Sequence, residues 1–442
     1  MLDTAMLNLA AARRRDLVGF CREVMDGLEV RPLMLALVRI ADGQLRIGDS
    51  WHRPVDRLGD VRMVAVGKAA SRMARAVVDQ LAPVGVLPRG LMVVPRGASW
   101  TPPPGITRIA AGHPEPDEAS LEAADAALRL LDGCTADTLV LFLISGGGSA
   151  LMERPATRDI TLADLTALNR LLVTSDLDIV GINTVRKAFS AVKGGRLAAA
   201  AVPAEQVTMY ISDVPDGRES MIASGPTMPD DTPVDACRSV LQQHGLLERL
   251  PASCRRLLDA GLPAPPAASV FAHSHYVAVA DNRVGIAILA RLAREAGFAV
   301  HVDDVVDDRP VEETVARLLD CLRELPAPAA IVSGGETICP VRGDGVGGRN
   351  LEFALRAAIA IDGQPIGILS FGTDGIDGNS PAAGAVVDGT TVDRALARWM
   401  DPVRSLRRSD SYPLLDTLGD AIVTGPTGQN VRDLRLLVKW PP

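Results

Sequence analysis

The sequence has few aromatic residues and no long apolar run. Phenylalanine, tryptophan and tyrosine make up only 3% of the 442 residues, whereas apolar residues together make up 47%. The hydrophobic core must therefore be mostly aliphatic. No stretch approaches the ~18–20 apolar residues needed to span a bilayer, and the strongest run, 139–144, has the length of a strand. We expect no membrane-spanning segment.

The sequence also lacks a basic run and any paired cysteines. The net charge is −8, and no basic stripe interleaved with aromatic residues suggests a nucleic-acid surface. The six cysteines contain no CxxC pair, so neither a zinc site nor a disulfide framework is indicated. This cysteine usage fits a reducing compartment, and the N-terminus makes a poor signal peptide. We therefore expect a cytoplasmic protein.

A repeated pattern along the chain predicts an α/β fold. Five short apolar runs are each followed by glycine or a small polar residue and then by a helical pattern: 62–66, 138–144, 207–211, 329–332 and 366–371. Apolar strands that alternate with helices indicate a mainly parallel sheet covered on both faces. In such sheets ligands bind beyond the carboxyl ends of the strands. The loops after these strands are therefore the candidate functional segments.

The length predicts two domains, because a single core of this size is unusual. A helix is expected over 5–30. The proline- and alanine-rich segment 250–269 is the candidate boundary, and a strand at 276–280 is expected to open the second unit. We predict a Rossmann-like α/β domain over 1–262 and a second α/β domain over 263–442, each with a mainly parallel sheet flanked by helices.

The glycine-rich loop 145–149, with sequence Ser-Gly-Gly-Gly-Ser, follows the most apolar strand. Its bare backbone N–H groups could bind phosphate at the start of a helix, although a tight strand-to-helix turn is the alternative. It is neither a Walker A loop nor a dinucleotide GxGxxG. Lys68 follows an earlier strand and a glycine, where a bound phosphate would complement its charge; a solvated surface lysine is the alternative.

A second glycine-rich loop, 342–348, precedes Arg349 and Asn350. An arginine at a helix start can bind a phosphate or carboxylate with two parallel hydrogen bonds. A flexible hairpin with an exposed arginine is the alternative.

Four acidic residues are expected at strand ends: Asp213, Glu336, Asp374 and Asp377. Phosphoryl transfer requires Mg²⁺, which prefers one or two carboxylates together with phosphate oxygens. It also uses a carboxylate to orient or deprotonate the attacking hydroxyl. Each of these acids could instead cap a helix or turn. His113, in a proline-rich loop, has a structural role or a substrate contact as equal alternatives.

Taken together, these loops resemble the glycerate 2-kinases that carry a C-terminal MOFRL domain. The matching segments follow in order over nearly the whole chain: 66–70, 113–117, 145–151, 183–187, 193–195, 212–214, 222–227, 334–337, 347–350, 372–378 and 424–428. Some family members carry the name hydroxypyruvate reductase. The loops after the predicted strands give that name no support, because none carries a nicotinamide fingerprint.

The resemblance implies transfer of the γ-phosphoryl group of ATP to the 2-hydroxyl of D-glycerate, with Mg²⁺, in a cleft between the two domains. Lys68 and Arg349 are then the key basic residues. The complete set of expected site residues is catalytic Lys68, Arg349 and Asp213; phosphate-binding Ser145, Gly146, Gly147, Gly148, Ser149, Gly347, Gly348 and Asn350; substrate-binding His113, Arg186 and Lys187; and metal-binding Glu336, Asp374 and Asp377.

The sequence departs from the family pattern at several positions. Ala188 replaces a histidine, the order Asp216-Gly217 is reversed, Leu351 replaces a glutamine and Ser409 replaces an asparagine. Lys68, Arg349 and the triple glycine are intact. Two alternatives to D-glycerate kinase therefore stay open: a paralogue that acts on another small 2-hydroxy acid, and a non-catalytic ligand-binding relative. The sequence also leaves open whether the protein forms a homodimer.

Overall fold

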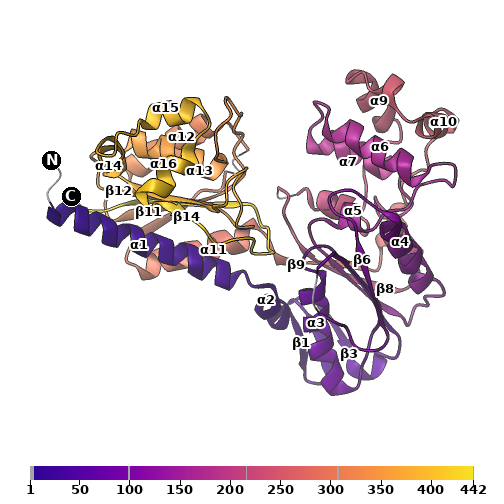
Figure 1. Cartoon of the computed structure of the whole chain (residues 1–442). Coiled ribbons are helices and arrows are strands. Elements are labelled where there is room, and N and C mark those ends of the chain that lie inside the picture. Colours follow the sequence, from indigo (N-terminus) through magenta and orange to yellow (C-terminus); the bar gives the residue numbers. More distant parts are fainter. Residues whose placement is uncertain (1–3, 98–99, 216, 306–307, 442) are drawn as a thin grey trace. The chain divides into compact units, whose positions relative to one another are not determined.

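The computed structural model describes residues 4–97, 100–215, 217–305 and 308–441. The chain divides into two compact units (Figure 1). The N-terminal unit is Val30–Val279, and the C-terminal unit is Ala280–Pro442 together with the N-terminal segment up to Glu29. The unit boundary thus lies 17 residues beyond the predicted 262/263 junction, and Asp216 falls outside the described residues.

A six-stranded sheet forms the centre of the N-terminal unit. Its order is β6-β5-β4-β7-β8-β9, and β4, β5, β6, β7 and β8 run parallel to one another. The strands are β4 (Val61–Val66), β5 (Arg89–Pro95), β6 (Ile106–Ala111), β7 (Leu139–Ile144), β8 (Glu205–Ile211) and β9 (Ser274–Ala280). Every residue of β4 and β7 is buried, as expected for parallel strands covered on both faces. The predicted Rossmann-like sheet is confirmed.

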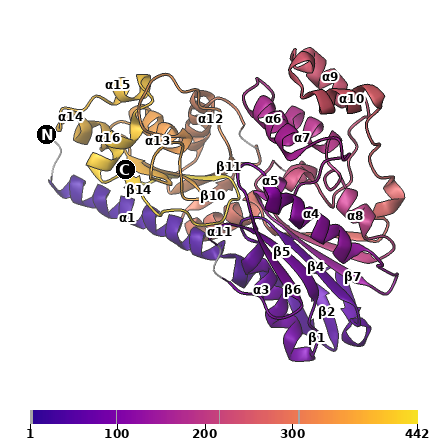
Figure 2. The ribbon, with the colours of Figure 1, turned by 45° about the vertical axis from the view of Figure 1, so that its right-hand side comes forward.

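Helices cover both faces of this sheet (Figure 2). Helix α3 (Ala70–Leu81) contacts β4, β5 and β7, and α4 (Glu118–Leu131) contacts β5 and β6. The short helices α5 (Gly148–Leu151) and α8 (Arg196–Ala200) follow glycines with positive φ angles. Four further helices, α6 (Leu162–Val173), α7 (Ile179–Ala188), α9 (Ala236–Gln243) and α10 (Ala252–Ala260), contribute to a separate apolar cluster.

A small antiparallel sheet precedes the large one in the chain. It consists of β1 (Val38–Ala41), β2 (Gln44–Ile47) and β3 (Trp51–Pro54), and it follows α2 (Val30–Leu37). The strand predicted at 276–280 exists as β9, but it completes the first sheet beside β8 instead of opening the second unit. The local sequence of β9 does not indicate that this strand lies beside β8. For this reason the predicted boundary between the two units falls before β9 instead of after it.

The sheet of the C-terminal unit is mixed, and here the prediction of a mainly parallel sheet is wrong. Its order is β10-β11-β15-β12-β13-β14, and only β10 and β11 pair in parallel. The strands are β10 (Ala299–Val302), β11 (Ala329–Gly335), β12 (Ile366–Gly372), β13 (Gly384–Asp388), β14 (Ala421–Ile422) and β15 (Asp433–Lys439). The last strand, β15, inserts between β11 and β12 and runs antiparallel to both. A strand that is buried on both faces has the same continuous apolar pattern whether it runs parallel or antiparallel to its neighbours. The sequence pattern therefore could not predict the direction of β15.

Helices cover both faces of the mixed sheet as well. One face packs on α12 (Val311–Glu324), α13 (Arg349–Ala360) and α16 (Ser411–Leu418), whose apolar residues share a cluster with Ile331, Ile368 and Leu437. The other face contacts α11 (Asn282–Glu295) and α1 (Thr4–Gly27). The remaining helices are α14 (Thr391–Leu396) and α15 (Pro402–Arg407). Helix α1 therefore belongs to the C-terminal unit, although it comes first in the chain (Figure 1). Among the described helices, none is long and apolar enough to cross a membrane.

Candidate active site

In the N-terminal unit, the loops after β4 and β7 are tied together. The Lys68 N–H donates to the Gly146 carbonyl over 3.0 Å, and the Ala69 N–H donates to Ser145 Oγ over 3.1 Å. Gly67 has φ +123, and a Cβ there would lie 2.2 Å from Ser145 Oγ. The glycine at position 67 is therefore needed for the close approach of the two loops. Lys68 itself is exposed beside the triple-glycine loop.

The triple-glycine loop borders a cavity of about 340 Å³ within the N-terminal unit. Six predicted site residues line it: His113, Gly146, Gly147, Ser149, Asp213 and, from α7, Arg186. The parallel strands β6, β7 and β8 end at the same sheet edge, which brings their loops together.

The glycines of the loop give the neighbouring side chains room. A Cβ on Gly146 would lie 2.6 Å from Asp213 Oδ2, and a Cβ on Gly147 would lie 3.0 Å from His113 Cδ2. Gly147 also has φ +87, a conformation that glycine adopts readily. Burial, followed by the nearby charge of Lys68, lowers the pKa of His113. The neutral imidazole is thus favoured in this cavity.

Arg186 and Lys187 are adjacent in sequence but have different surroundings. Arg186 lines the cavity, and its Nε donates to Asn169 Oδ1 over 2.9 Å. Lys187 Nζ instead pairs with Asp230 over 3.1 Å, and both side chains are buried. Successive residues on a helix point about 100° apart. The structure therefore brings Arg186 into the site and separates Lys187 from it.

Lys193 and Glu153 form a buried ion pair that the sequence did not indicate, and the charge of Glu153 acts on Arg186. Ser190 Oγ also donates to Glu153 Oε1 over 2.6 Å. Lys193 belongs to a Lys-Gly-Gly segment that the family resemblance marked, whereas Glu153 carried no signal. Asn183 was marked in the same way, and its Oδ1 accepts a hydrogen bond from Ser224 Oγ over 2.7 Å.

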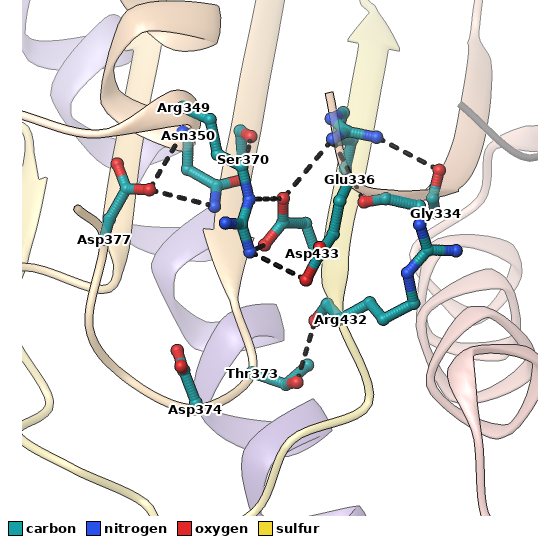
Figure 3. A network of polar contacts seen from close by, with 12 residues as sticks. Gly334, Glu336, Arg349, Asn350, Ser370, Thr373, Asp374, Asp377, Arg432 and Asp433 are labelled. Carbon is teal, nitrogen blue, oxygen red and sulfur yellow. Dashed lines mark hydrogen bonds and ion pairs between the residues drawn. The ribbon is translucent and has the colours of Figure 1, made fainter. Parts of the chain in front are cut away.

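In the C-terminal unit, Arg349 is the centre of a polar network (Figure 3). Its Nε and Nη2 bind the two oxygens of Asp433 over 2.6 and 3.0 Å, and Nη2 also binds Glu336 Oε1 over 3.0 Å. Asp433 is fully buried, and Arg435 lies 3.6 Å from it. Burial opposes the charged form of Arg349, but Asp433 and then Glu336 outweigh it, so its pKa is raised.

Strand order explains this convergence. Gly335 at the end of β11 and Gly372 at the end of β12 both pair with Asp433 at the start of β15. Asp433 begins a strand instead of following one, so it was not among the acidic residues predicted at the carboxyl ends of strands. The predicted residues Glu336 and Arg349 are brought together by a residue that the sequence did not single out.

Asp377 and Asn350 have structural roles at the start of α13. The oxygens of Asp377 accept the backbone N–H groups of Asn350 and Leu351 over 3.1 and 2.8 Å. The Asn350 side chain is buried and accepts from Ser370 Oγ over 2.7 Å. Burial, augmented by the charge of Asp433, raises the pKa of Asp377 to about 7 despite these backbone donors. Asp377 therefore caps a helix from a distant loop.

The glycines of the second loop are packed against other backbone. A Cβ on Gly348 would lie 2.4 Å from Asp377, and one on Gly345 would lie 2.4 Å from Asp410 Cβ. The run 343–348 has the literal spacing GxGxxG, but it begins eight residues after β11 ends and so does not form a nucleotide fingerprint turn. These glycines pack closely, and Gly345, Gly347 and Gly348 also line a cavity of about 470 Å³ together with Arg349. Phosphate binding by Gly347 and Gly348 stays a prediction.

The three predicted metal ligands do not form one cluster. Within the described ranges, no group of three or more His, Cys, Asp or Glu side chains could hold a metal ion. Asp377 is occupied by backbone N–H groups, and Asp374 lies apart from the Arg349 network (Figure 3). Mg²⁺ usually keeps several of its waters and also binds phosphate oxygens, so it needs only one or two protein carboxylates as ligands. Half-buried Glu336 and Asp374 fit that requirement, and Asp377 does not.

Comparisons with known proteins cover most of the chain. Residues 29–259 match a family described as a domain of unknown function, DUF4147, and residues 329–433 match the MOFRL family. A D-glycerate 2-kinase from Thermotoga maritima is 37% identical over 389 residues, covering 86% of this chain and 91% of that protein. A relative from Agrobacterium vitis with the provisional name hydroxypyruvate reductase is 37% identical over 435 residues, covering 95% and 97%. The crystal structure of a glycerate kinase from Thermotoga maritima superposes with a TM-score of 0.83 at 32% identity, covering 97% of this chain and 100% of that one.

Proposed function

Because this chain belongs to the glycerate kinase family, we propose that it is an ATP-dependent D-glycerate 2-kinase that forms 2-phosphoglycerate. Two family matches and a D-glycerate 2-kinase at 37% identity support the activity. The observation that carries the assignment at the level of residues is the cavity beside the triple-glycine loop, where His113, Arg186 and Asp213 converge.

We assign the acceptor to this cavity. A 2-hydroxy acid needs a cation for its carboxylate and a carboxylate near its hydroxyl, and Arg186 and Asp213 supply these two charges. Asp213, against Gly146, is the group that orients the 2-hydroxyl and takes its proton. Neutral His113 is suited to hydrogen-bond the substrate without competing for its carboxylate.

We assign the transferring phosphoryl group to fixed cations and backbone donors. Phosphoryl transfer depends mostly on positioning and charge stabilisation. Lys68 and the loop Ser145–Ser149 provide these in the N-terminal unit, and Arg349 provides a rigidly held guanidinium in the C-terminal unit. Mg²⁺, when bound, offsets phosphate charge, and we assign its protein ligands to Asp374 and Glu336.

The decisive experiment is incubation of purified protein with ATP, Mg²⁺ and D-glycerate, followed by phosphorus NMR. The expected product signal is that of 2-phosphoglycerate. A 3-phosphoglycerate signal contradicts the proposed regiochemistry. If D-glycerate is inert but another small 2-hydroxy acid in a panel is phosphorylated, the acceptor assignment is wrong while the kinase assignment stands.

Two controls separate the remaining alternatives. ATP binding without turnover on any acid of the panel indicates a non-catalytic relative. Oxidation of NADH with hydroxypyruvate indicates the reductase that the Agrobacterium vitis relative is named for. The expected result is no NADH oxidation, because in this chain the only run with GxGxxG spacing is separated from the preceding strand.

A further inference from the structure

The guanidinium of Arg186 is held at one end only. Its Nε donates to Asn169 Oδ1 on helix α6 over 2.9 Å, and in the part of the chain that the structure describes this is its only hydrogen bond. Arg186 and Asn169 both line the 340 Å³ cavity. Because Nε is occupied, the two terminal nitrogens remain for a ligand, and together they form an end-on pair of donors.

The charge of Arg186 is not neutralised by a direct protein partner. No described carboxylate forms an ion pair with it, and Glu153, the acid that influences it, is already bound by Lys193 and Ser190. Burial lowers the pKa of Arg186, with Glu153 opposing the effect. A half-buried cation without a counter-ion is unfavourable unless an anion completes it. The cavity therefore favours a small anionic ligand.

With Arg186 already assigned to the carboxylate of the acceptor, we propose that Asn169 is the positioning residue that orients its guanidinium. The identity of the acceptor rests on the proposed function, but the anion-binding role does not. The planar guanidinium fork matches a carboxylate with two parallel hydrogen bonds. Fixing Nε selects the rotation at which that fork opens into the cavity. The pair thereby selects 2-hydroxy acids over neutral alcohols of the same size.

Asn169 lies in none of the segments that carry the family resemblance, and its position comes from helix packing. Helices α6 and α7 contact each other, and Leu165, Leu168 and Leu172 anchor α6 in a buried cluster. With α6 held in place by these leucines, the Asn169 side chain lines the cavity. A merely structural Asn169 would affect stability alone, whereas a positioning residue affects the KM for the acid specifically.

The test compares Asn169→Asp with Ala167→Asp. Both add one negative charge to α6, but Ala167 is exposed and lines no described cavity. In Asn169→Asp the new carboxylate neutralises Arg186 and repels the acceptor. We expect the KM for D-glycerate to rise about 10- to 100-fold, the range of a charge-assisted hydrogen bond, with the KM for ATP unchanged. Ala167→Asp should leave both within about twofold.

Arg186→Gln tests the fork directly, and thermal unfolding of each variant confirms that it is folded. Asn169→Asp and Arg186→Gln variants that are folded and keep a normal KM for D-glycerate overturn the inference while leaving the kinase assignment intact. Calorimetry with D-glycerate and glycerol, in the presence of ADP, provides the complementary result. Binding of D-glycerate but not glycerol, lost in Arg186→Gln, supports the inference even if wild-type protein shows no turnover. Equal binding of both compounds, or binding of neither, overturns it.

Discussion

The two units each contain a glycine-rich loop and an arginine, yet they use them differently. In the N-terminal unit, Gly146 and Gly147 leave room for a cavity, and among the residues that the structure describes Arg186 has a single, neutral hydrogen-bond partner. In the C-terminal unit, Gly348 is packed against backbone, and Arg349 binds two carboxylates. Both loops border a cavity. Similar sequence patterns therefore leave one arginine with most of its donors open and hold the other in a pre-assembled network of carboxylates.

This difference separates ligand recognition from rigid charge placement. An open guanidinium gains most of its hydrogen bonds when a ligand arrives, so its loss should appear in KM. A guanidinium already fixed by two carboxylates, one of them fully buried, is pre-organised, which favours transition-state stabilisation. Loss of such a group should appear in kcat and also in stability, because its partners are left unpaired.

The largest effects are expected from Lys68→Ala and Arg349→Ala. Each should lower kcat on the order of 10²–10³-fold, by analogy with the loss of one transition-state donor. Only Arg349→Ala should also reduce the free energy of unfolding, by about 3 kcal/mol, because Asp433 is fully buried. Arg349→Lys should lose much of the activity, since lysine cannot form the bidentate pair. Kinetics and urea unfolding test the contrast; normal turnover in both alanine variants would refute the assignment.

Alanine substitutions in the two glycine-rich loops should sharpen the contrast between the two units. In Gly348→Ala the new Cβ meets Asp377 at 2.4 Å, so we expect a loss of about 3 kcal/mol or more in unfolding free energy. In Gly147→Ala the cost of φ +87 is smaller, about 1–2 kcal/mol. There the contact with His113 at 3.0 Å should mainly raise the KM for D-glycerate. Equal stability losses in the two variants would contradict the distinction.

The pH dependence of stability should report the buried Asp377 in the C-terminal unit. Its pKa is raised to about 7 in the folded state, above the ordinary value of 3.8. The stability that this shift contributes is present in full below pH ~4 and is lost as the pH rises through about 7. We expect the contribution to decline over this window by an amount on the order of a few kcal/mol. Urea unfolding of Asp377→Asn against wild type from pH 4 to 8 should show a flatter profile for the variant.

The smallest effect is expected from Ala188→His, which restores the residue typical of the family. Ala188 lines a different cavity from Arg186, beside Lys187 and Asp230. The substitution should therefore change turnover only mildly and cost about 1–3 kcal/mol of stability through overpacking. A panel of 2-hydroxy acids measures whether the preferred acceptor shifts. A loss of turnover as large as that of Lys68→Ala would show that this position belongs to the catalytic machinery.

Much of the candidate site in the N-terminal unit could be predicted from the sequence. The loops at 67–68, 113, 145–149 and 213 follow parallel strands, and the predicted residues His113, Ser149 and Asp213 line one cavity. This worked because parallel strands that end at one edge bring their following loops together. Lys187 does not fit that rule, because a helix, unlike a strand end, turns each successive side chain to a new direction.

The C-terminal unit was less predictable. Its strands were recognised from their apolar runs, but their direction was not, and Asp433 at the start of β15 escaped notice. The glycines at 343–348 were interpreted as a ligand loop; the structure shows that they also pack closely against 408–411 and Asp377, which the sequence did not indicate. Asn169 was missed as well, because a polar residue on a helix carries no signal of what it faces.

The sequence by itself determined the α/β class, the loops that carry the glycine runs and the family, because these depend on local periodicity and on ordered short motifs. Only the tertiary structure decided strand direction in the second sheet, the unit to which helix α1 belongs and the partners of each charged side chain. Ion pairs such as Arg349 with Asp433, 84 residues apart, depend on how distant segments pack. Local sequence encodes which groups are present, and packing decides which of them remain available to a ligand.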